Sequence, residues 1–157
     1  MSTARHTRTL AVALVATAAV SFAAFADGEL APLSQDAFLA LPRSGDAAPF
    51  VLDVRTPEEF VSGHVPGAVN IPYDQVAARL AEVPKDKDVV LYCRSGRRAG
   101  LAGEVLASNG YTRLQHLEGD IVAWQEKQRP TEVPRDPGSC AEALKQGKPQ
   151  AEACNPH

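Results

Sequence analysis

The sequence lacks a basic stripe, an internal repeat and a Cys-x-x-Cys motif. Its 16 Lys and Arg residues are outnumbered by 19 Asp and Glu residues, which gives a formal net charge of −3. No segment interleaves basic with aromatic residues, so the composition argues against nucleic-acid binding. What is present is the balance of an ordinary globular protein, with 45% hydrophobic and 22% charged residues. A length of 157 residues suggests one domain with small additions.

Residues 1–26 have the features of a secretory signal peptide. Arg5 and Arg8 make a positive leader, residues 10–24 are almost wholly apolar, and the small residues that end at Ala26 fit a cleavage site. We therefore predict cleavage after Ala26 and export to the periplasm, with release from the cell as the alternative. A retained membrane anchor fits less well, because the apolar run is short for a hydrocarbon core of ~30 Å.

The rest of the chain divides into a folded domain, 27–130, and a C-terminal tail, 131–157. Within the domain, apolar strands alternate with helical segments, which predicts an α/β fold with a mainly parallel sheet. We expect strands at 50–54, 68–72, 89–92 and 114–117, and helices at 34–41, 56–60, 73–80, 98–108 and 121–127. Residues 27–32 are expected to be a mobile start. In the tail, Pro, Gly and polar residues replace the apolar periodicity, so it is interpreted as an appendage and not a second domain.

The segment Cys93-Arg94-Ser95-Gly96-Arg97-Arg98 connects the predicted buried strand 89–92 to the next helix. A tight connection at this end of a parallel strand directs several backbone N–H groups to one point and forms an anion site. Gly96 permits backbone angles that a side chain would resist. The three arginines add positive charge, which favours the thiolate of Cys93. The segment therefore predicts a nucleophilic sulfur in an anion pocket; the alternative is a buried structural cysteine beside a surface arginine cluster.

Four segments, taken in order, resemble the rhodanese family. They are residues 52–60, 63–72, 92–98 and 117–124. With the leader, the chain is similar to a periplasmic single-domain rhodanese, over about residues 33 to 130. The resemblance implies a single rhodanese-like α/β domain whose mainly parallel central sheet has helices on both faces.

The resemblance also implies a mechanism in which Cys93 carries sulfur. Its thiolate would take the outer sulfur of an anionic donor such as thiosulfate, sulfite would leave, and a thiol or cyanide would accept the sulfur from the Cys93 persulfide. No cofactor or metal is required. The loop residues would bind the donor, and Arg98 would orient it and reach toward the first matching segment. The residues expected to bind the substrate are Arg94, Ser95, Gly96, Arg97 and Arg98.

Residues outside the loop are expected to support it. The resemblance implies that Asp53 supports the loop from the neighbouring strand end, and that Arg55 makes structural contacts. His64 is interpreted as a structural hydrogen-bonding residue, because transfer from an activated thiolate hardly needs a general base. Trp124 is assigned to the core. One departure from the family stands out: its closing segment usually has two successive glycines, and Asp120 occupies the second position. Asp tolerates left-handed backbone angles, but its carboxylate could weaken anion binding.

The tail contains the two remaining cysteines, Cys140 and Cys154. In an oxidising compartment the simplest arrangement pairs them in a disulfide and leaves Cys93 free. One alternative is a metal site that includes His157, but two cysteines and one histidine lack the spacing of a structural zinc site. Another is a thiol redox enzyme in which the tail cysteines resolve the Cys93 persulfide.

Two further classes of protein compete with a sulfurtransferase. Phosphatases and arsenate reductases of related fold resemble this loop but place five residues between the cysteine and the arginine. Counted from Cys93, that arginine would stand at Ala99, one residue after Arg98. The shorter loop favours sulfur over a larger tetrahedral oxyanion. A rhodanese-like binding module without the nucleophile is the second class, and the presence of Cys93 in a complete basic loop argues against it.

Overall fold

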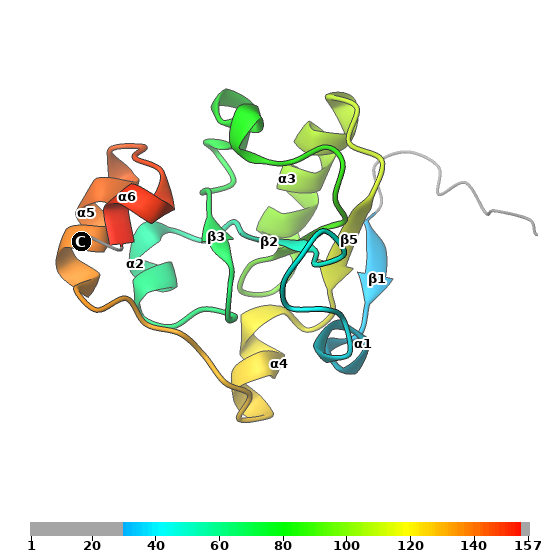
Figure 1. The fold of residues 1–157 in the computed structure, drawn as a ribbon, viewed down its shortest axis with the longest axis horizontal. Coiled ribbons are helices and arrows are strands. Elements are labelled where there is room, and N and C mark those ends of the chain that lie inside the picture. The colour runs from blue at the N-terminus through cyan, green and yellow to red at the C-terminus, as the bar shows by residue number, and fades with distance from the viewer. Residues whose placement is uncertain (1–29, 155–157) are drawn as a thin grey trace, which may run out of the picture.

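The computed structural model describes residues 30–154, which form a five-stranded parallel sheet flanked by helices (Figure 1). The strand order is β1-β5-β4-β2-β3, and every pairing is parallel. The strands are β1 (Ala31–Leu33), β2 (Phe50–Asp53), β3 (Val69–Asn70), β4 (Val89–Tyr92) and β5 (Leu114–Leu117). The helices are α1 (Gln35–Leu39), α2 (Pro57–Val61), α3 (Arg97–Ser108), α4 (Asp120–Glu126), α5 (Pro137–Lys145) and α6 (Gln150–Cys154), with short 3-10 helices η1 (Val76–Ala78) and η2 (Leu80–Glu82).

Two apolar cores lie on the two faces of the sheet, as the predicted architecture requires. Alternate residues of β4 divide between them: Val89 and Leu91 pack with α3 and η1, whereas Val90 and Tyr92 pack with α1, α2 and α4. All four β4 side chains are buried, which confirms the prediction of a strand covered on both faces. The central strand therefore ends, at Cys93, between two layers of helices.

Helix α2 begins where local sequence rules place it. The Thr56 hydroxyl accepts from the Glu59 N–H, and the Glu59 carboxylate accepts from the Thr56 N–H, which completes a capping box. Pro57 occupies the first helical turn, where its missing N–H costs nothing. These contacts fix the position of Glu59, whose carboxylate also reaches the loop after β4.

Two predictions about local structure are wrong. Residues 27–32 were expected to be a mobile start, but Ala31–Leu33 form β1 and pair with β5 at the sheet edge. The helix expected at 73–80 is replaced by η1 and η2. β1 has only three residues, one of which is Pro32, so its sequence alone does not indicate a strand. The strand forms because it pairs with the distant residues 115–117.

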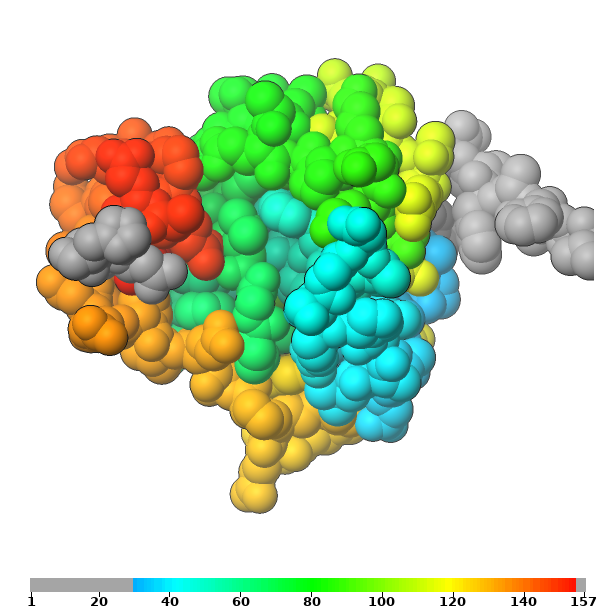
Figure 2. Space-filling view, viewed as in Figure 1, coloured from blue at the N-terminus to red at the C-terminus, as the bar shows by residue number. Residues whose placement is uncertain are grey.

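The C-terminal segment is more ordered than its composition predicts. Helices α5 and α6 pack on each other and beside α2, at the β3 end of the sheet (Figures 1 and 2). As predicted, a disulfide joins Cys140 to Cys154. The Gln150 side chain forms hydrogen bonds with the outer edge of the sheet: its Oε1 accepts from Asn70 N–H at 2.8 Å, and its Nε2 donates to Ala68 O at 2.9 Å. The tail thus covers the edge strand β3.

Within residues 30–154, no helix is both long and apolar enough to cross a lipid bilayer. The predicted signal peptide, residues 1–26, lies outside the described residues.

Candidate active site

Cys93 lies at the carboxyl end of β4, in the connection to α3. It is the free cysteine among residues 30–154, and its side chain is buried. The Gly96 N–H donates to the Cys93 sulfur across 3.1 Å. Gly96 has φ +95°, and a Cβ there would lie 3.4 Å from His116 Cε1 and 3.5 Å from an Asp120 carboxylate oxygen. The positive φ therefore favours glycine, since a Cβ there would make only ordinary contacts, and the Gly96 N–H is directed at the Cys93 sulfur.

The start of α4 fixes the backbone of Cys93. The Asp120 carboxylate accepts from the Cys93 N–H at 2.7 Å, and the Ile121 N–H donates to the Cys93 carbonyl at 3.2 Å. Asp120 is buried and adopts the left-handed backbone with φ +53°, in line with the expectation that Asp keeps this turn. The preceding Gly119 also has positive φ, and a Cβ there would lie only 2.5 Å from Ala123 Cβ.

The arginines of the loop have two different environments. Arg98 is half-buried and pairs with Glu59 through both guanidinium ends, with one contact of 2.8 Å. The hydrogen bond to Arg98 lowers the pKa of Glu59 to about 2, and that to Glu59 raises the pKa of Arg98, with a smaller effect from the nearby Cys93. Arg94 and Arg97, like Ser95, are exposed. As expected, the Arg98 side chain extends to the segment 52–60, but it pairs there with the Glu59 carboxylate, which compensates its charge.

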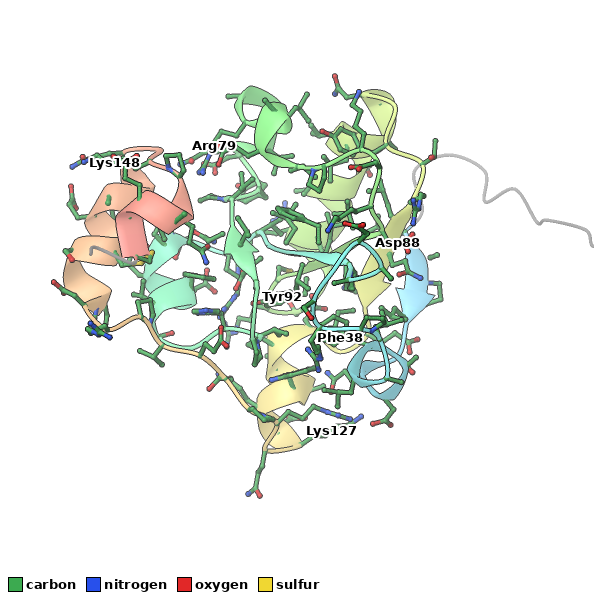
Figure 3. All side chains as sticks on the ribbon, viewed as in Figure 1. Phe38, Arg79, Asp88, Tyr92, Lys127 and Lys148 are labelled. Atoms are coloured by element: carbon green, nitrogen blue, oxygen red, sulfur yellow. A yellow bond between two sulfur atoms is a disulfide. The ribbon has the colours of Figure 1, made fainter. Side chains whose placement is uncertain are left out.

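A cluster of buried polar side chains surrounds the hydroxyl of Tyr92, the residue that precedes Cys93. Asp53 accepts from the Tyr92 hydroxyl at 2.6 Å and from the Arg55 guanidinium, and Arg55 also donates to the Gly63 carbonyl. Asn70 donates to the backbone carbonyls of Asp53 and Arg55. Tyr92, at the centre of the molecule in Figure 3, has its pKa raised well above the usual range, first by burial and then by the Asp53 charge.

This cluster contains Asp53 and Arg55, the two residues that the sequence predicted to support the loop. Asp53 bonds the end of β4 through Tyr92, and among the described residues its side chain has no hydrogen bond to the loop 93–98 itself. Arg55 is buried and is held by Asp53. Tyr92 was missed because, within an apolar run, a tyrosine indicates core and gives no sign of the partner of its hydroxyl.

His64 lies in a second environment, between α2 and the tail. Its ring stacks on Phe60 with centroids 3.7 Å apart, and its Nδ1 is 3.0 Å from the Phe60 carbonyl. Burial lowers its pKa. The imidazole faces a groove of about 210 Å³ that is lined also by Glu132, Arg135 and Cys154. Its contacts match the structural role expected from the sequence.

Trp124 is fully buried in the core, as expected. It packs edge-on against Phe38, with ring centroids 5.8 Å apart, and its indole N–H donates to the Pro130 carbonyl.

Two residues near the loop were not singled out from the sequence. Glu59 pairs with Arg98, and His116 Nε2 lies 3.0 Å from Asp120 Oδ2. The capping pattern of Thr56 and Glu59 predicts where Glu59 lies in α2, but no sequence pattern near Glu59 indicates that it pairs with Arg98. The hydrogen bond to Asp120 is the largest cause of a raised pKa for His116.

Residues 34–127 match the model of the rhodanese-like domain. The chain belongs to this family. A sulfurtransferase of Allochromatium vinosum is 42% identical over 84 residues, which are 54% of this chain and 78% of that protein. Thiosulfate sulfurtransferase PspE of Escherichia coli is 43% identical over 75 residues, which are 46% of this chain and 72% of that protein.

Solved structures agree with the fold. The rhodanese-related protein of Thermoplasma volcanium is 31% identical, with a TM-score of 0.51 over 55% of this chain and 85% of that one. A protein of unknown function from Rhodopseudomonas palustris, described as a possible tyrosine phosphatase, is 26% identical, with a TM-score of 0.56 over 66% of this chain and 85% of that one. The protein is therefore a single rhodanese-like α/β domain related to sulfurtransferases.

Proposed function

We propose that this rhodanese-like protein is an exported sulfurtransferase that carries sulfane sulfur as a persulfide on Cys93. The observation that carries the proposal is the loop geometry: a free cysteine at the end of the central strand, with the Gly96 N–H donated to its sulfur and exposed arginines beside it. The relationship to named sulfurtransferases supports the reaction class.

The reaction needs only the thiolate, a donor and an acceptor. The Cys93 thiolate attacks the outer sulfur of thiosulfate, a new S–S bond forms, and the old S–S bond breaks with its electron pair leaving on sulfite. The carbon of cyanide, or the sulfur of a thiolate, then attacks the outer persulfide sulfur and returns Cys93 as a thiolate. Charge and electrons balance in both steps, so no redox partner is required.

The charges around the loop fit an anionic donor. Arg94 and Arg97 are exposed cations at the site and attract the donor. Arg98 is held by Glu59, so it presents a fixed guanidinium beside Cys93. The N–H of Gly96 stabilises negative charge on the attacking sulfur.

The proposal includes export and the predicted chain organisation. A disulfide between Cys140 and Cys154 suits an oxidising compartment, and the leader with cleavage after Ala26 supplies the route. The domain then spans 27–130, with β1 as its edge strand, and residues 131–157 form the disulfide-linked tail. Because Cys140 and Cys154 are paired with each other, neither is a free thiol that could resolve the Cys93 persulfide, which argues against a redox role for them.

The decisive experiment is the intact mass of the protein after incubation with thiosulfate. We expect a gain of one sulfur atom, which cyanide removes, in the native protein, and no gain in Cys93→Ser. An aryl phosphate ester offered to the same samples should not be hydrolysed. Failure of every sulfane donor to add sulfur to Cys93, or phosphate release that depends on Cys93, would overturn the proposal.

A further inference from the structure

A buried carboxylate lies directly against the candidate nucleophile. One oxygen of Asp120 accepts from the Cys93 N–H at 2.7 Å, and the other lies 3.0 Å from Nε2 of His116. Asp120 is 2% exposed, whereas the His116 side chain is 27% exposed. His116 is the ionisable side chain that contacts the Asp120 carboxylate among residues 30–154.

The position of this pair is fixed from several sides. Gln35 Nε2 donates to the backbone carbonyls of Glu118 and Asp120, which holds the turn that carries the carboxylate. Gly96 lies against both members, because a Cβ at that residue would be 3.4 Å from the imidazole and 3.5 Å from the carboxylate. The pair therefore forms the floor under the loop that holds the Cys93 sulfur.

We propose that the His116–Asp120 pair sets the charge beneath the Cys93 loop and makes the binding of anionic sulfur donors depend on pH. The inference rests on the proposed sulfur-transfer function and assigns both residues as positioning residues for the donor site. With His116 protonated, the pair is neutral as a whole. With His116 neutral, the Asp120 charge is uncompensated beside a thiolate and a dianionic donor.

The surroundings of His116 give the sign of the effect. The charges that act on it are Asp120 from α4 and Glu118 from the turn that follows its own strand β5. Its neighbours in β1 and β4 are Pro32 and Leu91, which carry no charge. Both carboxylates favour the imidazolium, so the pKa of His116 is raised above its usual 6.5, first by the hydrogen bond to Asp120. Donor affinity is therefore highest below that raised pKa and falls as the pH increases through it.

The test measures thiosulfate binding by calorimetry between pH 5.5 and 9 in Cys93→Ser, where neither the nucleophile nor transfer contributes. One uncompensated charge close to a bound dianion in a half-buried site should weaken binding by about threefold to tenfold across this range. In the same background, His116→Gln should bind weakly at every pH, as the parent does at high pH. Asp120→Asn should bind tightly at every pH, and asparagine suits the left-handed backbone there.

Controls separate this role from simple structural support. His64→Gln changes the other histidine among residues 30–154, which is buried away from the loop's hydrogen bonds, and should retain the parental pH profile. NMR titration of the His116 imidazole should show a lower pKa in Asp120→Asn, because the partner carboxylate is gone. A structural role alone predicts that both substitutions weaken binding without changing its pH dependence, and that result would overturn the inference.

The outcomes also distinguish the inference from the function on which it rests. Persulfide formation on Cys93 in the native protein, together with an unchanged pH profile in His116→Gln, would reject the inference and leave the sulfurtransferase intact. Absence of both thiosulfate binding and a persulfide would reject both.

Discussion

Removal of one hydroxyl, in Tyr92→Phe, should destabilise the protein more than any other tyrosine-to-phenylalanine change among residues 30–154. The Tyr92 hydroxyl donates to the Asp53 carboxylate at 2.6 Å and accepts from the Val65 N–H at 3.0 Å, and all three groups are buried. Because one lost hydrogen bond is to a charged group and the other is to a backbone amide left without a partner, we expect a loss of about 2 to 4 kcal/mol. Arg55 still neutralises Asp53, so the variant should fold.

The assay is urea unfolding of the three single variants Tyr73→Phe, Tyr111→Phe and Tyr92→Phe, with the disulfide intact. Tyr73 is exposed, so its substitution should have little effect. The Tyr111 hydroxyl lies within hydrogen-bonding distance of the carbonyls of Leu80 and Val83, so Tyr111→Phe should cost about 1 kcal/mol. If Tyr92→Phe cost no more than Tyr111→Phe, the cluster at the end of β4 would not provide the support inferred for the loop.

Three further predictions concern the loop and the tail. Glu59→Gln should lower the free energy of unfolding by about 1 kcal/mol at neutral pH and raise the thiosulfate KM, because Arg98 loses its partner. The pKa of Glu59 is about 2 in the folded protein, against an ordinary 4.5. Urea unfolding should therefore show that the native protein loses its stability advantage over Glu59→Gln as the pH falls from 4.5 towards 2. Replacement of both Cys140 and Cys154 by alanine should cost about 3 kcal/mol by the chain-entropy estimate, measured by the same unfolding assay, and should leave the mass gain on thiosulfate treatment intact. Gly96→Ala should reduce the rate of persulfide formation at least tenfold, through strain of about 1 to 3 kcal/mol at positive φ. The control Gly100→Ala should retain the native rate, because outside its own helix backbone and chain neighbours no atom lies within 4 Å of the new Cβ.

Local patterns predicted much of the fold and the centre of the candidate site. The apolar run of β4, the Thr56 cap of α2 and the glycine of the loop each leave a signal within a few residues, and the structure has all three. The contacts that complete the site join distant residues. Asp120 lies 27 positions after Cys93, and Glu59 lies 39 positions before Arg98. Only the parallel packing of strand ends brings these residues together, and a single sequence does not record that packing.

The long-range contacts change the expected electrostatics of the loop. From sequence alone, three arginines surround the Cys93 sulfur and the site is strongly positive. In the structure, Glu59 compensates one of them, Arg98, and Asp120 adds a carboxylate that accepts a hydrogen bond from the Cys93 N–H. Under the proposed function, attraction of an anionic donor depends on the exposed Arg94 and Arg97, whose electrostatic fields are readily screened by salt. In the inference proposed above, the remaining charge at Asp120 is set by a single proton on His116, a residue that lies outside the four segments that resemble the family.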